Sequence, residues 1–132
     1  MPPDAGMREK INELSNRIIG AAIEVHRHLG PGLLESAYEA CLCRELELRG
    51  IAYERQIPVA LDYKGLRVET AYRLDLRVER LVIVELKAVE KTDAVYEAQL
   101  LTHLRLADLW LGLLINFNVR VLKDGIKRLV NG

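Results

Sequence analysis

Two acidic residues and a lysine near the middle of the chain are the residues best suited to chemistry. Asp75 lies in the segment Leu74–Val78, and Glu85 and Lys87 lie in the segment Leu81–Ala88. Both segments alternate apolar and polar residues, which predicts β-strands. Carboxylate oxygens suit Mg²⁺ or Mn²⁺, ions that bind through one or two carboxylates and retain several waters. We therefore expect a divalent-cation site beside a lysine that could orient or activate a water.

The apolar residues of the two segments predict how their strands pair. In a hairpin turning at residues 79–81, one register puts every apolar side chain on one face: Val78 opposite Val82, Leu76 opposite Val84 and Leu74 opposite Leu86. The same register places Asp75 opposite Glu85, with Cβ atoms about 5 Å apart, and Lys87 on the same face. A pairing shifted by two residues keeps the face and staggers the contacts.

Like charges that face each other across two strands destabilise the pair, so the acids need a compensating charge. A bound cation is one explanation. The alternative is that Lys87 and Arg73 neutralise Asp75 and Glu85 on an ordinary solvated face of the sheet.

Further polar and aromatic residues recur at helical spacing. Glu35 falls in the first turn of an expected helix, one turn before Tyr38. Tyr96, Gln99 and His103 form a stripe on a later helix, and packing on the sheet would aim Gln99 at the acidic cluster. For Glu35 and Tyr38 the alternatives are a favourable first-turn acid and a core aromatic. For Gln99 and His103 the alternative is a pair of boundary residues half in water.

Apolar periodicity predicts the helices that carry these residues. The expected helices cover residues 8–29, 33–49 and 93–107. The core stripe expected for the third helix comprises Val95, Ala98, Leu101 and Leu104. Gly30-Pro31-Gly32 ends the first helix, and Gly50 ends the second. We expect residues 1–7 to be a flexible lead and residues 8–132 to form a single domain.

Alternating apolar residues predict the strands. They are expected around residues 57–61, 68–78, 81–88 and 109–116. Asp124-Gly125 suits a tight turn, so residues 121–130 are expected to close the fold as a hairpin. The order is helix, helix, three strands, helix, strand and a short ending, which indicates a mixed α/β fold.

Composition limits the class of protein. The 132 residues contain 19 Lys plus Arg and 19 Asp plus Glu, so the net charge is zero and a histone-like nucleic-acid binder is excluded. The longest apolar run falls far short of the ~20 residues that cross a bilayer, and the first residues lack the pattern of a signal peptide. We expect a soluble cytoplasmic protein that does not bind membranes.

Two cysteines and two histidines suggest a further alternative, a reduced-thiol or Zn²⁺ protein using Cys41, Cys43, His26 and His28. Without an export signal, the cysteines are expected to be reduced thiols. His26 and His28 are not one helical turn apart, so they do not share a ligand face.

Several of these motifs together resemble the GxxExxY family of the PD-(D/E)xK nuclease-like superfamily, and the resemblance covers nearly the whole chain. The naming motif is Gly32-x-x-Glu35-x-x-Tyr38. The other matching blocks are Tyr72–Leu76, Val84–Ala88, Glu97–Leu101 and Gly112–Asn118. This resemblance implies a restriction-endonuclease-like αβββαβ core, with a mixed central sheet flanked by helices and an extra N-terminal helix.

The resemblance also implies roles for individual residues. The implied catalytic residues are Glu35, Asp75, Glu85, Lys87 and Gln99. The implied ligands of Mg²⁺ or Mn²⁺ are Asp75, Glu85 and the backbone carbonyl of Leu86, with Glu35 as a further ligand. The implied supporting residues are Tyr38, Arg73, Tyr96 and His103. Family members commonly carry Tyr four residues after the glutamine, where this chain has His103.

The resemblance implies Mg²⁺-dependent hydrolysis of phosphodiester bonds in DNA or RNA. The alternative is a non-catalytic module that keeps the nuclease fold and binds nucleic acid or a protein partner. A homodimer is also expected, because so small a domain leaves sheet edges exposed.

Overall fold

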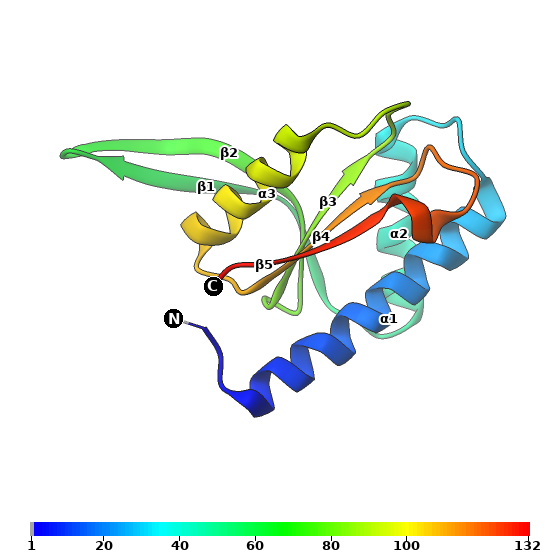
Figure 1. The fold of residues 1–132 in the computed structure, drawn as a ribbon, viewed down its shortest axis with the longest axis horizontal. Coiled ribbons are helices and arrows are strands. Elements are labelled where there is room, and N and C mark those ends of the chain that lie inside the picture. The colour runs from blue at the N-terminus through cyan, green and yellow to red at the C-terminus, as the bar shows by residue number, and fades with distance from the viewer. Residues whose placement is uncertain (1) are drawn as a thin grey trace.

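A five-stranded mixed sheet forms the centre of the protein, whose computed structural model describes residues 2–132 (Figure 1). The strands are β1 (Tyr53–Tyr63), β2 (Leu66–Val78), β3 (Val82–Lys87), β4 (Leu111–Asn116) and β5 (Ile126–Val130). The helices are α1 (Ala5–Leu29), α2 (Glu35–Leu48), α3 (Ala94–Ala107) and the short 3₁₀ helix η1 (Leu122–Gly125). The strand order is β1-β2-β3-β4-β5, and only β3 and β4 are parallel. From α2 to β4, the chain therefore has the expected αβββαβ order.

Helix α1 begins at Ala5, earlier than the residue 8 expected, because Asp4 caps it. The Asp4 Oδ1 atom accepts a hydrogen bond from the Met7 N–H at 2.8 Å, which satisfies a donor of the first turn. At the other end, Gly30 adopts a φ of 69°, and its N–H donates to the His26 carbonyl. The expected stop at Gly30 is confirmed.

Helices cover both faces of the sheet, with α1 and α2 on one side and α3 on the other (Figure 1). The smaller core, under α3, consists of Leu74, Ile83, Leu100, Leu104 and Leu114. The core stripe expected for α3 is therefore correct only at Leu104. Val95 and Leu101 are 48% and 38% exposed because the helix rests on the sheet through Leu100 and Leu104, one turn apart.

The predicted register between β2 and β3 is confirmed at Val78–Val82 and Leu76–Val84. The ladder ends there, and the expected pair of Leu74 with Leu86 is not formed. Its place is taken by a side chain, because Asp75 Oδ2 accepts the Leu86 N–H at 2.8 Å.

The expectation that six apolar residues share one face is consequently wrong for Leu74. Leu74 packs in the core under α3, whereas Leu86 packs in the core under α1 and α2. Asp75 and Glu85 are also not a directly opposed ladder pair.

The closing segment is not the hairpin expected for residues 121–130. Asp124 and Gly125 lie inside η1, and β5 pairs with β4 instead of with its own preceding residues. Gly125 packs directly against the backbone carbonyl of Asn116, where a Cβ atom would collide. Gly125 is therefore needed because two backbone segments approach closely there, and it does not form a two-residue turn.

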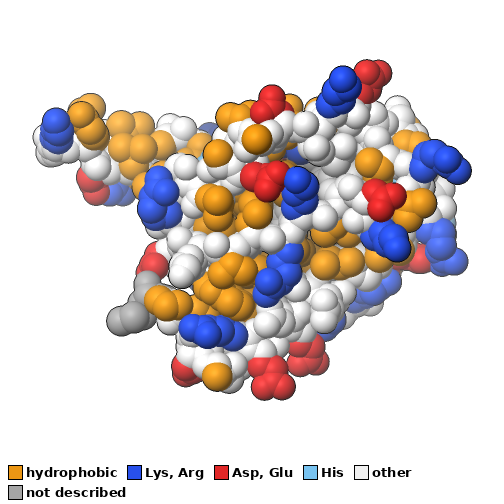
Figure 2. Space-filling model, viewed as in Figure 1, with side chains coloured by type: hydrophobic (Ala, Val, Ile, Leu, Met, Phe, Trp, Pro, Cys, Tyr) orange, Lys and Arg blue, Asp and Glu red, His pale blue; other side chains and the backbone are white. Residues whose placement is uncertain are grey.

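Strands β1 and β2 are longer than expected and extend beyond α3 as a two-stranded arm (Figure 1). Apolar side chains lie on this arm in the space-filling view (Figure 2), and Tyr63 and Leu66 near its tip are 59% and 62% exposed. The arm is the main part of the sheet that no helix covers.

Candidate active site

The predicted acidic cluster forms where β2 and β3 meet the first turn of α2. Asp75 is partly buried on β2, Glu85 is 8% exposed on β3, and Glu35 is exposed at the start of α2. The charges of Glu85 and Glu35 both act on the Asp75 carboxyl. The β2–β3 hairpin thus brings Asp75 and Glu85 together, and the packing of α2 on the sheet adds the charge of Glu35.

Asp75 has the most strongly perturbed carboxyl of the cluster. Burial raises its pKa to about 7, the hydrogen bond from the Leu86 N–H opposes this rise, and the charges of Glu85, Glu35 and Glu39 add to it. A carboxyl with this pKa is partly protonated near neutral pH. It becomes a full anion when a positive charge is placed beside it.

Glu85 is held by His103 from α3. The distance from Nδ1 of His103 to Oε1 of Glu85 is 2.6 Å, and both side chains are largely buried. The imidazole stacks on Tyr72 with ring centroids 3.9 Å apart and planes 6° apart, and the Tyr72 hydroxyl donates to the His103 carbonyl at 3.1 Å. Burial and the Glu85 charge raise the pKa of Tyr72 to about 12, so its hydroxyl keeps its proton.

Lys87, at the end of β3, lies against α3. Its Nζ atom is 4.6 Å from the centroid of the Tyr96 ring, a cation–π contact. A cavity of about 30 Å³, large enough for one water, opens beside it. The cavity is lined by Glu85, Lys87, Tyr96, Gln99, Leu100, His103 and Leu114. The stripe expected on α3 therefore reaches the acidic cluster, with Gln99 at the edge of the cavity.

Glu35 has a mixed electrostatic environment. Partial burial raises the pKa of its carboxyl, Lys87 lowers it, and the charges of Glu39 and Glu85 raise it. The carboxyl of Glu35 therefore responds to the charges of Lys87 and Glu85.

Tyr38 shapes the loop before Glu35 and does not enter the cluster. It is fully buried, its hydroxyl donates to the Gly30 carbonyl at 2.6 Å and accepts the Leu33 N–H at 3.2 Å, and its ring stacks on Phe117 at 4.6 Å. The aromatic of the Gly-x-x-Glu-x-x-Tyr motif thus fixes the path of the chain into α2.

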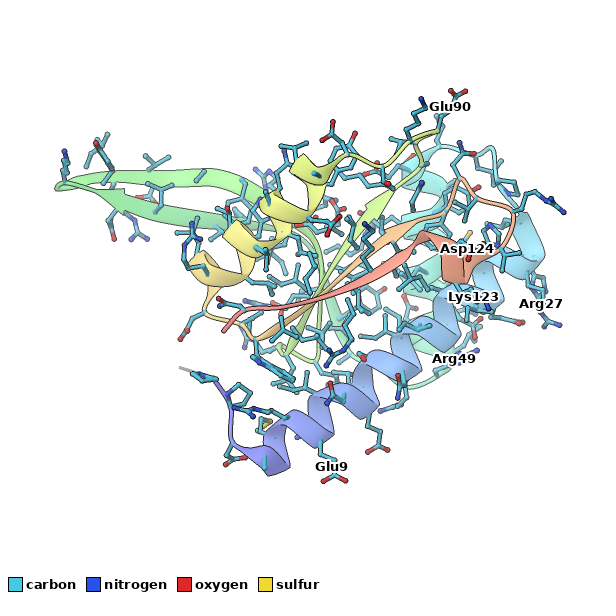
Figure 3. All side chains as sticks on the ribbon, in the orientation of Figure 1. Glu9, Arg27, Arg49, Glu90, Lys123 and Asp124 are labelled. Carbon is cyan, nitrogen blue, oxygen red and sulfur yellow. The ribbon has the colours of Figure 1, made fainter. Side chains whose placement is uncertain are left out.

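Arg73 lies exposed on β2, and no ion pair joins it to any residue within 2–132. It therefore forms no contact that would neutralise Asp75 or Glu85 as an ordinary surface pair. Glu90, in the loop after β3, points away from the body of the protein and lies outside the cluster (Figure 3).

Asn116 is a site-shaping residue that the sequence reasoning did not single out. Its side chain is 3% exposed at the end of β4, beside Lys87 of the parallel strand β3. Its Oδ1 atom accepts from the N–H groups of Val89 and Asn118 at 3.1 Å, and its Nδ2 donates to the Val89 carbonyl at 3.0 Å. This amide fixes the chain directly after Lys87.

A second group missed from sequence is a pairing of a buried glutamate on α2 with two exposed residues on β1. Glu39, one turn after Glu35, is 8% exposed and contacts Arg55 and Gln56. The spacing of the two glutamates was the available signal, because residues four apart in a helix share a face.

The available oxygen atoms suit a cation that keeps several of its water ligands better than a cation whose ligands all come from the protein. Asp75 and Glu85 each use one oxygen in a hydrogen bond, to Leu86 N–H and to His103, which leaves the other oxygen for a ligand. No group of three or more His, Cys, Asp or Glu side chains within residues 2–132 is arranged to hold a metal ion. Mg²⁺ needs only one or two carboxylates, so these residues fit it.

The Zn²⁺ alternative finds no such fit. His26 Nε2 lies 2.8 Å from the Val119 carbonyl, and burial raises the pKa of the Cys43 thiol, which disfavours the thiolate that binds zinc.

Comparison with known proteins identifies the superfamily of the chain. The family model of the PD-(D/E)XK nuclease superfamily matches residues 12–129, so the chain belongs to that superfamily. The mixed sheet with flanking helices and an N-terminal helix is a restriction-endonuclease-like α/β fold. No curated protein and no solved structure matches the chain. Among residues 2–132, no helix combines the length and apolarity of a membrane span.

Proposed function

We propose that this nuclease-like protein is a Mg²⁺-dependent nuclease of the GxxExxY type that hydrolyses phosphodiester bonds of DNA or RNA in the cytoplasm. The observation that carries the proposal is the pair Asp75 and Glu85 on neighbouring strands, each with one oxygen bound, by the Leu86 N–H and by His103, and the other open to a ligand. Burial and the neighbouring acids raise the pKa of Asp75 to about 7. A fold that gathers acids around a partly buried carboxyl carries an electrostatic cost that a divalent cation would remove.

Asp75 and Glu85 would hold Mg²⁺, with the Leu86 carbonyl and Glu35 as further ligands. The ion would polarise the phosphate and increase the acidity of a bound water. His103 orients Glu85 through its Nδ1 contact, and the Leu86 N–H orients Asp75. Fixed carboxylates of this kind bind a cation without reorganisation.

Lys87 and Gln99 would act on the attacking water. Both line the cavity of about 30 Å³ next to Glu85, which has room for one water. The ammonium group of Lys87 would orient that water and stabilise the charge that develops on the phosphate. Tyr96 confines the ammonium group from its other side.

The direct test is cleavage of DNA and RNA by the purified protein in Mg²⁺, compared with Glu85→Ala and Lys87→Ala. Both variants should lose cleavage and keep the wild-type circular dichroism spectrum. Glu9→Ala and Lys10→Ala are matched controls on exposed positions near the start of α1, where Glu9 points into solvent (Figure 3), and should cleave normally. Undiminished cleavage by both site variants would contradict the assignment.

Calorimetric titration with Mg²⁺ separates this proposal from a non-catalytic module that keeps the fold. The nuclease should bind Mg²⁺ in a manner abolished by Asp75→Ala. A chain that binds nucleic acid but shows no carboxylate-dependent Mg²⁺ binding would be the non-catalytic module.

A homodimer is the assembly we propose, with the exposed arm as a contact. Tyr63 and Leu66 leave an apolar surface at its tip. Light scattering should give twice the 15.0 kDa mass of the chain, and a Leu66→Glu variant should give the single mass.

A further inference from the structure

Helix α2 carries two glutamates near the site, and they differ in exposure and in their contacts. Glu35 and Glu39 are four residues apart and share a face of the helix. Glu35 is exposed and lies near Lys87, whereas Glu39 is 8% exposed. The charge of each acts on Asp75, with Glu35 the stronger.

Both oxygens of Glu39 are bound to β1. Oε2 accepts from Nη2 of Arg55 at 2.7 Å and from Nε at 3.2 Å, and Oε1 accepts from Nε2 of Gln56 at 2.9 Å. Because Arg55 holds one oxygen and Gln56 holds the other, the two residues together fix both the position and the orientation of the carboxylate. The pairing also neutralises the charge of Glu39 at the rim of a site that already contains three acids.

The backbone at Gln56 departs from regular strand geometry at the position opposite Asp75. Arg55 pairs with Leu76 and Ile57 pairs with Leu74, but the β1–β2 ladder contains no pair at Gln56. Gln56 has a φ of 49°, a left-handed conformation that is strained for a residue with a side chain. The residue that bears this strain is the one whose side chain reaches Glu39.

We propose that Glu39 is a positioning residue whose carboxylate is kept out of the cation site by Arg55 and Gln56. The clamp sets α2 against β1 so that Glu35 is the α2 acid that meets the cation. It thereby limits the number of charges available to the ion. This inference rests on the proposed cation site and adds to it a device that controls the affinity of that site.

The experiment is a titration with Mn²⁺ alone, followed by electron paramagnetic resonance. Arg55→Met removes the guanidinium and keeps much of its apolar stem, so Glu39 is released. Mn²⁺ should then bind about tenfold more tightly, or with a second ion. The double variant Arg55→Met with Glu39→Gln should lose this gain, because no carboxylate remains to be released. Arg55→Lys keeps the charge but loses the two-nitrogen contact, so its Mn²⁺ affinity should rise less than that of Arg55→Met.

Removing a different arginine near Asp75 tests whether the gain in Mn²⁺ affinity comes from release of Glu39 or only from the loss of a positive charge. Arg77→Met removes an equal charge two residues from Asp75 and breaks a comparable ion pair, with Glu54 at 2.9 Å, and should change Mn²⁺ affinity less than twofold. Equal gains in Arg77→Met and Arg55→Met would overturn the inference, as would a gain that persists in the double variant.

Failure of the inference differs from failure of the proposed function. Mn²⁺ binding that Asp75→Ala abolishes, together with an unchanged Arg55→Met, would overturn the clamp and leave the cation site standing. No Mn²⁺ binding by the wild type and Arg55→Met would overturn both. If Arg55→Met is poorly folded, Gln56→Gly, which permits the same backbone, replaces it and should raise Mn²⁺ affinity in the same direction.

Discussion

His103 on α3 and Glu85 on β3 are joined by a contact of 2.6 Å between Nδ1 and Oε1. The histidine is itself fixed by the Tyr72 ring on which it stacks. His103 binds one oxygen of this buried carboxylate, and this contact sets the direction in which the other oxygen points. The position of α3 on the sheet therefore determines where a cation can bind Glu85.

Replacing His103 tests this dependence. His103→Phe keeps a ring against Tyr72 but removes the nitrogen that contacts Glu85. Mg²⁺-dependent cleavage and Mn²⁺ affinity should fall about 10- to 100-fold, the usual cost of losing a partner of a metal ligand. Tyr72→Phe, which keeps the ring and loses only the hydroxyl contact to the His103 carbonyl, should cost less. Equal losses in the two variants would contradict a specific role for the Glu85 contact.

Asp75 gives the stability of the protein a defined pH dependence. Its pKa is about 7 in the folded protein and near the ordinary 3.8 in the unfolded chain. Between these values the folded state binds more protons, so the free energy of unfolding falls as pH rises. The contribution of Asp75 is fully present below about pH 4 and is lost through pH 7. Its size should be on the order of 1 kcal/mol, because solvent screens a partly exposed group.

Urea unfolding between about pH 4 and pH 8 measures this effect. Asp75→Asn should remove the fall of stability with pH. Mg²⁺ at pH 8 should stabilise the wild type and leave Asp75→Asn unchanged, because the ion replaces the proton as the compensating charge. Parallel pH profiles for the two proteins would exclude Asp75 as the source.

Asn116 should be important for both stability and cleavage. Asn116→Ala removes three hydrogen bonds and leaves the N–H and carbonyl of Val89 without their partner, which should cost about 2–3 kcal/mol in urea unfolding. Because Asn116 fixes the chain after Lys87, the folded fraction of the variant should also cleave more slowly. A stable variant with normal cleavage would show that this loop is held by other contacts.

Tyr38 should be structural, although it belongs to the motif that suggested a family. Tyr38→Phe loses the hydroxyl that joins Gly30 to Leu33 and keeps the stack on Phe117. We expect a loss of about 1–2 kcal/mol in the free energy of unfolding and near-normal cleavage per folded molecule. A large loss of cleavage at unchanged stability would instead place the hydroxyl in the reaction.

The order of helices and strands was predictable from the sequence because apolar residues recur at a different spacing in helices and in strands. The register at Leu76–Val84 followed from alternating apolar residues, which can face the core in only one way. The same reasoning failed at Leu74, because the Asp75 side chain replaces a ladder bond and the strands separate there. The pattern of apolar residues does not show that a side chain will form a hydrogen bond with the backbone of a neighbouring strand.

The face of α3 could not be chosen from spacing alone. Val95, Ala98 and Leu101 are spaced as a helical stripe, and so are Leu100 and Leu104, which form the real contact. Two apolar stripes on one helix leave its rotation open. The resemblance implied a supporting role for His103, but its contact with Glu85 depends on that rotation, so spacing alone could not identify this partner.

The clamp on Glu39 was hidden for a different reason. Glycine and asparagine are the residues that most often adopt a left-handed backbone, but here Gln56 adopts it. Its partners Arg55 and Glu39 lie on different elements, so their proximity requires the tertiary fold.

The single parallel pairing in the sheet sets an order in which the site can assemble during folding. Asp75 and Glu85 come from consecutive strands joined by a tight turn, so they meet through local contacts that form rapidly. Lys87 meets Asn116 only after the whole of α3 has crossed the sheet, because β3 and β4 are parallel. We therefore expect the mutually repelling acids to be gathered before the segment that completes the cavity arrives. Closure of the β3–α3–β4 crossover would then be the folding step that has to overcome their repulsion.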